Sequence, residues 1–176
     1  MILDSGQRRE FDSGAVRDIV EGKGRCDLLP LDILACVIDA SSLTAIFGSE
    51  YVGSDLNKDL LVSILNELNS FVRSGDVDAI YRSVTDFAAL NYSDFLTAIL
   101  EVAKHYEQGC NKYGERNWEK GIPLHCYIDS GIRHLLKFSR GDNDEPHDRA
   151  FIWNMLGAAW TVKYHEELID LPFKEG

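Results

Sequence analysis

The sequence has no closely spaced pair of cysteines. Its four cysteines, Cys26, Cys36, Cys110 and Cys126, lie far apart and form no CxxC motif. Zinc knuckles and redox-active dithiols both need such pairs, so neither kind of site is indicated. We expect four reduced thiols, as in proteins of the cytosol.

Long apolar segments are absent as well. Residues 1–9 lack the apolar core of a signal peptide, and no later segment is suited to span a bilayer. We therefore expect a soluble, cytoplasmic protein with no membrane partner.

Positive charge is scarce. The chain has 18 Lys and Arg against 29 Asp and Glu, a formal net charge of -11. Binding to the phosphates of nucleic acid requires a basic face, so we expect no nucleic acid partner. An acidic chain can still hold a phosphorylated ligand if its carboxylates bind a divalent metal that meets the phosphates.

The length of 176 residues and the hydrophobic content of 45% predict one domain, residues 1–176. Apolar residues recur at three- and four-residue steps over 60–72, which predicts an amphipathic helix ending at Ser74-Gly75. Further helices are predicted over 76–90 and after the cap Ser93-Asp94. The fold class is therefore all-α, and the Gly-rich residues before Pro30 predict an irregular amino-terminal loop.

The most informative segment is the central loop, residues 112–121, which joins cations and two aromatic rings to flexible glycines. This chemistry suits a phosphorylated, ring-bearing ligand. The alternative is a solvated turn with one buried Trp. The candidate ligand-binding residues are Lys112, Arg116, Asn117, Trp118 and Lys120.

Polar residues on the two flanking helices extend this candidate site. Glu101, His105, Gln108 and Lys112 fall at steps of four, three and four, so they form a stripe that runs toward the central loop. An exposed face is the competing interpretation of that stripe.

The helix predicted to start at Pro123 carries Asp129, Arg133 and His134, and the last two lie among apolar neighbours. At least one of these two must face inward or into a cleft. The alternative for an inward His134 is a hydrogen-bonded core histidine.

An acidic segment follows Gly141 and becomes a helix at Pro146. Glu145 and Asp148 are three residues apart, so both can approach one ion. Such oxygen-rich ligands favour magnesium or manganese over zinc. Asn154, on the same side of this helix, is either part of the site or a satisfied core amide. The acids of the segment are Asp142, Asp144, Glu145 and Asp148, with His147 among them.

The run KYGERNWEKGIPLHCYIDSGIRHLLKF, followed by HDRAFIWNMLGAAWT, resembles a phage and bacterial family of dATP/dGTP diphosphohydrolases. This family includes MazZ-type enzymes related to the all-α MazG nucleoside triphosphate pyrophosphatases. Residues 11–18 and 22–30 resemble the amino-terminal signature of the same family. The stretch of approximately 36–91 is expected to be a helical insertion.

The resemblance implies a MazG-like helical bundle that hydrolyses a purine deoxynucleoside triphosphate to the monophosphate and pyrophosphate. The favoured substrate is dGTP, with dATP as the other candidate. It further implies a homo-oligomer, dimer or tetramer, and a phage enzyme in the host cell cytoplasm that supplies dGMP for 2-aminoadenine nucleotide synthesis.

MazG-like enzymes bind magnesium through an EExxE motif on one helix and an ExxD motif on the next. Glu145-Pro146-His147-Asp148 matches ExxD, but the chain contains no EExxE. The expected cofactor is Mg²⁺ or Mn²⁺. Its expected ligands are Glu145 and Asp148, with Asp144, His134, Asp129 and Glu101 as weaker choices.

The expected reaction needs cations near the phosphates and an oriented water. Glu145, Asp148 and His134 are the predicted catalytic residues, since a carboxylate or His134 can orient the water. Surface ion pairs are the alternative for each cation. The predicted substrate-binding residues are Lys112, Arg116, Asn117, Trp118, Lys120, Arg133, Lys23, Arg25 and Asn154.

Two other functions stay open at this point. The first is an HD-type phosphohydrolase, which would release triphosphate from a dNTP. Its set of metal-binding residues is similar to His134, the pair His147-Asp148 and Asp170. The second alternative is a nonenzymatic, nucleotide-binding oligomeric phage protein.

Overall fold

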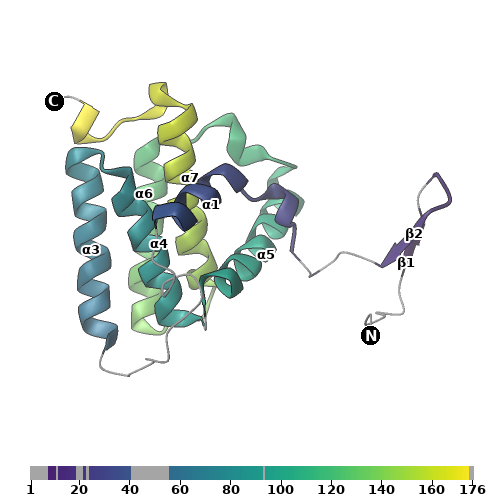
Figure 1. Cartoon of the computed structure of the whole chain (residues 1–176), viewed down its shortest axis with the longest axis horizontal. Helices are drawn as coiled ribbons and strands as arrows, with labels where there is room; N and C mark the ends of the chain where they lie inside the picture. The colour runs from purple at the N-terminus through teal and green to yellow at the C-terminus, as the bar shows by residue number, and fades with distance from the viewer. Residues whose placement is uncertain are drawn as a thin grey trace.

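The protein is a bundle of α-helices in the computed structural model, which describes residues 8–10, 12–18, 22, 24–40, 56–92 and 94–174. This confirms the predicted all-α fold class. No helix in the described part of the chain combines the length and apolar character needed to cross a membrane. The helices, shown in Figure 1, are α1 (Leu31–Ala40), α3 (Leu56–Ser74), α4 (Val77–Asn91), α5 (Phe95–Tyr113), α6 (Leu124–Arg140) and α7 (His147–Tyr164).

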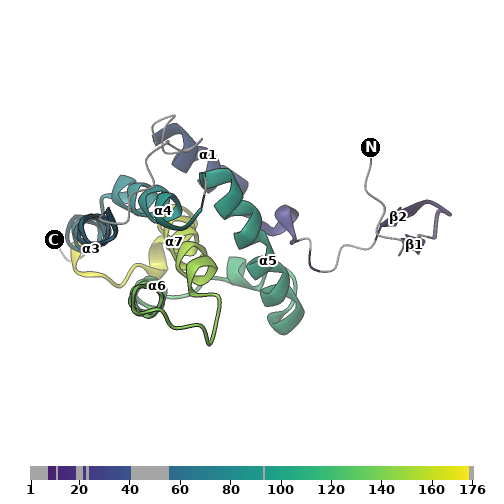
Figure 2. The same cartoon turned by 90° about the horizontal axis from the view of Figure 1, so that it is seen from below.

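The amino-terminal segment differs from the expected irregular loop, because it contains a short antiparallel hairpin. Strand β1 (Arg8–Glu10) pairs with β2 (Val16–Asp18), with Arg8 opposite Asp18. Gly14 adopts a φ of 79° in the connection, a value that glycine reaches without steric cost. Figures 1 and 2 both show the hairpin lying apart from the helices.

Helix α7 forms the centre of the bundle. It packs against α4, α5 and α6, which surround it in both views (Figures 1 and 2). A helix that is apolar on every side is buried by its neighbours. The apolar residues of α7 with 0% exposure are Phe151, Ile152, Met155, Leu156 and Ala158.

Two glycines allow α6 and α7 to approach closely. A Cβ on Gly157 of α7 would lie 2.3 Å from the ring of Tyr127 on α6. A Cβ on Gly131 of α6 would lie 2.3 Å from the terminal carbon of Met155 on α7. The close fit fixes the residues that follow Gly131 on α6 against the start of α7.

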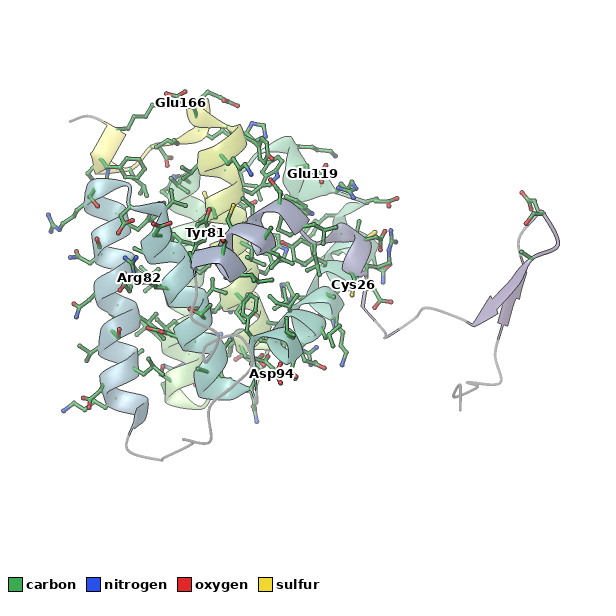
Figure 3. The ribbon with its side chains drawn as sticks, viewed as in Figure 1. Cys26, Tyr81, Arg82, Asp94, Glu119 and Glu166 are labelled. Atoms are coloured by element: carbon green, nitrogen blue, oxygen red, sulfur yellow. The ribbon has the colours of Figure 1, made fainter. Side chains whose placement is uncertain are left out.

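The predicted helix ends agree with the structure. Asp94 precedes α5 and accepts a hydrogen bond from the Thr97 backbone N–H at 2.7 Å, an N-cap contact. Figure 3 shows Asp94 at this start of α5. Helix α3 ends at Ser74, followed by Gly75 with a φ of 72°. These signals are local, so the sequence carries them directly.

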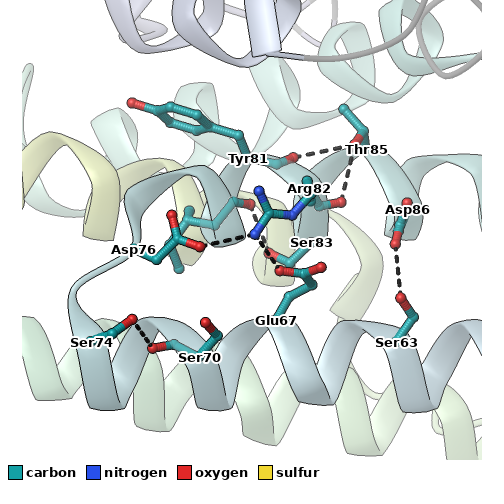
Figure 4. Close-up of polar contacts among 11 residues, drawn as sticks. Ser63, Glu67, Ser70, Ser74, Asp76, Tyr81, Arg82, Ser83, Thr85 and Asp86 are labelled. Atoms are coloured by element: carbon teal, nitrogen blue, oxygen red, sulfur yellow. Dashed lines mark hydrogen bonds and ion pairs between the residues drawn. The ribbon is translucent and has the colours of Figure 1, made fainter.

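The stretch 36–91 contains the end of α1 and the helices α3 and α4. Helices α3 and α4 pack on each other. Arg82 of α4 donates to Glu67 of α3 at 2.8 Å and to Asp76 at 3.0 Å, and Ser63 of α3 donates to Asp86 at 3.3 Å (Figure 4). Phe87 of α4 lies 4.5 Å from the ring of Phe151 on α7, measured between centroids. The α3–α4 pair is thereby joined to the central core.

Candidate functional site

A cavity of about 520 Å³ lies between α5, the central loop, α6 and the start of α7. It combines aromatic rings with polar and charged groups. Its lining includes Leu28, His105, Tyr106, Gln108, Lys112, Tyr113, Arg116, Asn117, Trp118, Ser130, His134, Glu145, Trp153 and Asn154.

The central loop forms one wall of this cavity. Helix α5 is followed by Gly114, whose φ is 92°, and Arg116 is left-handed with a φ of 51°. The short 3-10 helix η2 (Asn117–Lys120) follows and ends at Gly121, whose φ is 95°. Both glycines thus adopt positive φ values that residues with a side chain rarely reach.

Trp118 is part of the hydrophobic core and also lines the cavity. The residue is 7% exposed, and its ring lies edge-on to Tyr106 at 5.8 Å and to Trp160 at 4.9 Å. Its indole Nε1 has no hydrogen-bond partner among the described residues. The buried-Trp and ligand-site interpretations of the loop are therefore compatible.

The three cations of the central loop differ in position. Lys112 lines the cavity, and its Nζ lies 4.8 Å from the ring centre of Tyr113. Arg116 also lines it, while pairing with Glu119 and donating to the Asp27 carbonyl at 2.8 Å. Lys120 is exposed outside the cavity lining and donates to Asn117 Oδ1 at 3.2 Å.

The segment before α1 is held against α5. The Glu107 carboxylate accepts hydrogen bonds from the backbone N–H groups of Gly22 at 3.0 Å and Gly24 at 2.8 Å. A Cβ on Gly24 would lie 2.9 Å from the Ala103 backbone. This contact brings Leu28 into the cavity wall.

Arg25, one of the two predicted amino-terminal cations, is not part of the cavity lining. Arg25 pairs with Asp27 at 2.6 Å and with Glu115 at 2.9 Å. The hydrogen bond with Asp27 raises the pKa of Arg25. Lys23, the other predicted cation, lies outside the described residues.

A histidine pair, His134 of α6 and His147 of α7, lies beside the cavity. Their Nδ1 atoms are 2.8 Å apart. The His147 side chain is 0% exposed, and its Nε2 lies 2.8 Å from Asp144 Oδ1. Burial lowers the pKa of His134, which favours its neutral form. Lys137, at 2.7 Å, and His147 hold the pKa of Asp144 well below its usual range.

The acids around this pair can hold a divalent metal. His134, Glu145 and His147 form one group with ligand atoms within 4.8 Å of one another, and Asp142, Asp144 and His147 form a second. Both groups combine imidazole with carboxylate. Asp142 accepts a hydrogen bond from Arg140 at 2.7 Å, whereas Glu145 is exposed and lines the cavity.

Asp148 and Glu101 lie in a neighbouring polar cluster. The Tyr92 hydroxyl donates to Asp148, and burial followed by this hydrogen bond raises the pKa of Tyr92. Glu101 pairs with Lys104 at 2.5 Å and with Arg149 at 2.7 Å. The structure therefore gives both predicted ligands protein partners outside the two His-containing groups.

Asp129 and Arg133 form an ion pair on the exposed side of α6. Their side chains are 66% and 57% exposed, and neither lines the cavity. The expectation that Arg133 or His134 faces inward is confirmed, because His134 lines the cavity and Arg133 does not. Asn154 also lines it, while its amide donates to the Ala150 carbonyl at 2.7 Å.

His105 and Trp153 both line the cavity, although neither is among the predicted catalytic, metal-binding or substrate-binding residues. Their ring centres lie 5.9 Å apart, and burial lowers the pKa of His105. His105 Nδ1 has no hydrogen-bond partner in the part of the chain that the structure describes. The polar stripe contained the signal for His105, since Gln108 and Lys112 of that stripe also line the cavity.

The HD-type arrangement requires Asp170 near the histidine pair. Asp170 instead accepts hydrogen bonds from the backbone N–H of His125 at 2.9 Å and contacts the His125 ring at 2.5 Å. His125 lies in the first turn of α6, nine residues before His134. The contacts of Asp170 thus separate it from the other members of that set.

Comparison with known families identifies the class of protein that carries this site. A family model described as "dATP/dGTP diphosphohydrolase, N-terminal" matches residues 81–170, about half of the chain. The protein is thus a nucleoside triphosphate pyrophosphohydrolase with a MazG-like, all-α fold. It belongs to the dATP/dGTP diphosphohydrolase family, and the matched residues include the whole cavity lining except Leu28. No curated protein and no solved structure matches the chain.

Proposed function

We propose that the enzyme hydrolyses a purine deoxynucleoside triphosphate, with dGTP favoured over dATP, in a reaction that depends on a divalent metal. The cavity is the observation that best supports this function, because its lining contains cations and rings of the central loop as well as His134 and Glu145. Its volume of about 520 Å³ lies within the range of small-molecule sites.

The nucleoside is assigned to the aromatic side of the cavity. Trp118, Trp153 and Tyr113 supply ring faces and edges for a base, and Asn117 supplies an amide for sugar or base. His105 and Asn154 add polar atoms among these rings. Hydrogen bonds from a few such groups can discriminate between purines.

The triphosphate is assigned to the side that carries Lys112 and Arg116. Both side chains line the cavity, and guanidinium and ammonium groups are suitable partners for phosphate oxygens. Lys120, Arg133 and Arg25 are weaker assignments, because they lie outside the cavity lining. The same cations stabilise the charge that accumulates on departing pyrophosphate.

Magnesium or manganese is the proposed cofactor, and the donor set fits a divalent ion. His134, Glu145 and His147 can approach one ion, with Asp144 adjacent. When bound, such an ion neutralises phosphate charge and polarises the bonds at phosphorus. Asp148 remains a predicted metal ligand because it is the Asp of the ExxD motif. Glu101 and Asp129 are weaker candidates for metal ligands.

In the proposed reaction, a water molecule attacks the α phosphorus from the side opposite the oxygen that bridges the α and β phosphates. His134 and Glu145, the two members of the metal-binding group that line the cavity, are the proposed residues that orient this water. The water oxygen bonds to the α phosphorus as the bond to the bridging oxygen breaks. The products are the nucleoside monophosphate and pyrophosphate.

The proposed setting follows the family resemblance. We assign the whole chain, 1–176, to one MazG-like domain with a helical insertion at approximately 36–91. The enzyme is proposed to act as a homo-oligomer in the cytoplasm of a phage-infected cell, where its dGMP feeds 2-aminoadenine nucleotide synthesis.

A panel of dNTPs and NTPs with chromatography of the products tests this function. Purified protein with Mg²⁺ or Mn²⁺ should convert dGTP into dGMP and pyrophosphate in equal amounts. Release of triphosphate would refute the proposal and support the HD-type reaction. No consumption of any purine dNTP with magnesium, manganese or cobalt would favour nucleotide binding without turnover.

A further inference from the structure

We infer that the metal centre of this enzyme is built on two imidazoles, His134 and His147, together with Glu145, and that Asp144 orients His147. This inference rests on the proposed metal-dependent function. In this arrangement Asp148 is not one of the central ligands, and the bound metal is manganese or cobalt rather than magnesium.

The first step concerns the position of the two rings. His147 is the first residue of α7, and its side chain is completely buried against α6. The Nδ1 atoms of His147 and His134 face each other at 2.8 Å. Two ring nitrogens at this distance need either a proton or a metal ion between them, since their lone pairs otherwise repel.

The second step concerns the orientation of His147. Its Nε2 donates to Asp144 Oδ1 at 2.8 Å, and Lys137 donates to the other oxygen of Asp144 at 2.7 Å. A ring that carries its proton on Nε2 presents a lone pair on Nδ1. Metal-binding histidines generally use such a carboxylate on the distal ring nitrogen, which fixes the tautomer and the ring direction.

The third step adds the carboxylate of Glu145. This side chain belongs to the same group of convergent ligand atoms as the two histidines. His134 and Glu145 line the cavity, whereas His147 lies behind them. Three protein donors leave coordination positions for phosphate oxygen or water, and the cavity is the side from which a substrate can reach them.

Metal preference follows from the donor atoms. Magnesium binds oxygen ligands almost exclusively, whereas imidazole is a good ligand for later divalent metals. Two imidazoles with one carboxylate also form a set that is common in non-haem transition-metal sites. The histidine pair thereby gives a metal site to a chain that has ExxD but no EExxE motif.

Cobalt titration of the full chain tests the assignment without requiring turnover. Wild-type protein, stripped with chelator, should bind Co²⁺ with visible absorption bands typical of nitrogen ligation, and more tightly than Mg²⁺ in competition. His147→Gln and His134→Gln should each weaken Co²⁺ binding by about 100-fold or more. Asp144→Asn should weaken it by roughly 10- to 100-fold.

His125→Gln serves as the matched control, because it removes an exposed histidine from the same helix as His134. It should keep Co²⁺ affinity within about threefold of wild type. Asp148→Asn compares this site with the ExxD ligand set: it removes the carboxylate that contacts Tyr92 and should weaken Co²⁺ binding less than His147→Gln does. Circular dichroism reports whether each variant is folded, and exposed Glu145→Gln replaces His147→Gln if the buried substitution prevents folding. Glu145→Gln should weaken Co²⁺ binding by at least about tenfold.

The inference fails if the folded His147→Gln and Glu145→Gln variants keep wild-type Co²⁺ affinity. It also fails if Asp148→Asn loses binding while these two do not. Failure of the proposed function is a different result: Co²⁺ binding depends on the histidine pair, yet no purine dNTP is hydrolysed with any metal.

Discussion

Gly157→Ala should both destabilise the protein and disturb the proposed metal centre. Gly157 lies on α7, where an added Cβ would sit 2.3, 2.7 and 2.9 Å from three atoms of the Tyr127 ring on α6. An aromatic ring fully enclosed in the core cannot move aside as the end of a flexible chain can. The methyl group must therefore push α6 away from α7.

The size of the effect is a balance of two terms. Overpacking of a core contact costs about 1–3 kcal/mol. Alanine in the middle of a helix gains roughly 1 kcal/mol over glycine. The net loss in unfolding free energy is therefore up to about 2 kcal/mol. At about 2–4 °C per kcal/mol for a chain of this size, the melting temperature should fall by up to roughly 8 °C.

Thermal unfolding followed by circular dichroism measures this loss, with Gly109→Ala as the matched control. Gly109 lies inside α5, and a Cβ there meets nothing within 4 Å. Gly109→Ala should therefore raise the melting temperature through its helix propensity alone. Gly157→Ala should in addition weaken Co²⁺ binding, because the histidine pair joins the same two helices. An increase in melting temperature equal to that of Gly109→Ala would refute the packing argument.

The other predictions concern substrate, catalysis and pH. Lys112→Ala should raise the KM for dGTP by about tenfold, whereas Lys120→Ala should leave it unchanged; equal effects in steady-state kinetics would contradict the cavity assignment. Asp148→Asn should remove most turnover in a product assay while preserving the helical circular-dichroism signal, and near-normal activity would count against its catalytic role. Glu167 raises the pKa of His165 above its ordinary value of 6.5, so this contact stabilises the fold fully below that value and loses its effect as pH rises through the folded pKa. The melting-temperature difference between wild type and Glu167→Gln should therefore shrink from pH 6 to pH 8, and a constant difference would exclude this origin.

Local patterns explain why the helices and the central loop could be predicted. The periodic run 60–72 lies within α3, and the Asp94 cap starts α5, because both features act within one turn of helix. The loop 112–121 could be selected on composition, since its cations, amide and rings are unusual for a connection. Neither inference needs knowledge of a distant residue.

Partners far apart in the sequence explain why the roles of individual acids could not be predicted. Asp148 meets the predicted ion-binding spacing, but its contact is Tyr92, 56 residues earlier. Glu101 pairs with Arg149 on another helix. Asp129 and Arg133 are both predicted to belong to the site, but their four-residue spacing on a helix also suits the exposed ion pair that they form.

The proposed metal centre and the core share one helix interface. His134 lies three residues after Gly131, at which α6 meets Met155 of α7, and His147 begins α7 itself. The ring nitrogens can converge only where the two helices approach closely, and the small residues at positions 131 and 157 allow that approach. A substitution that separates α6 from α7 should therefore reduce metal affinity even when it touches none of the ligands.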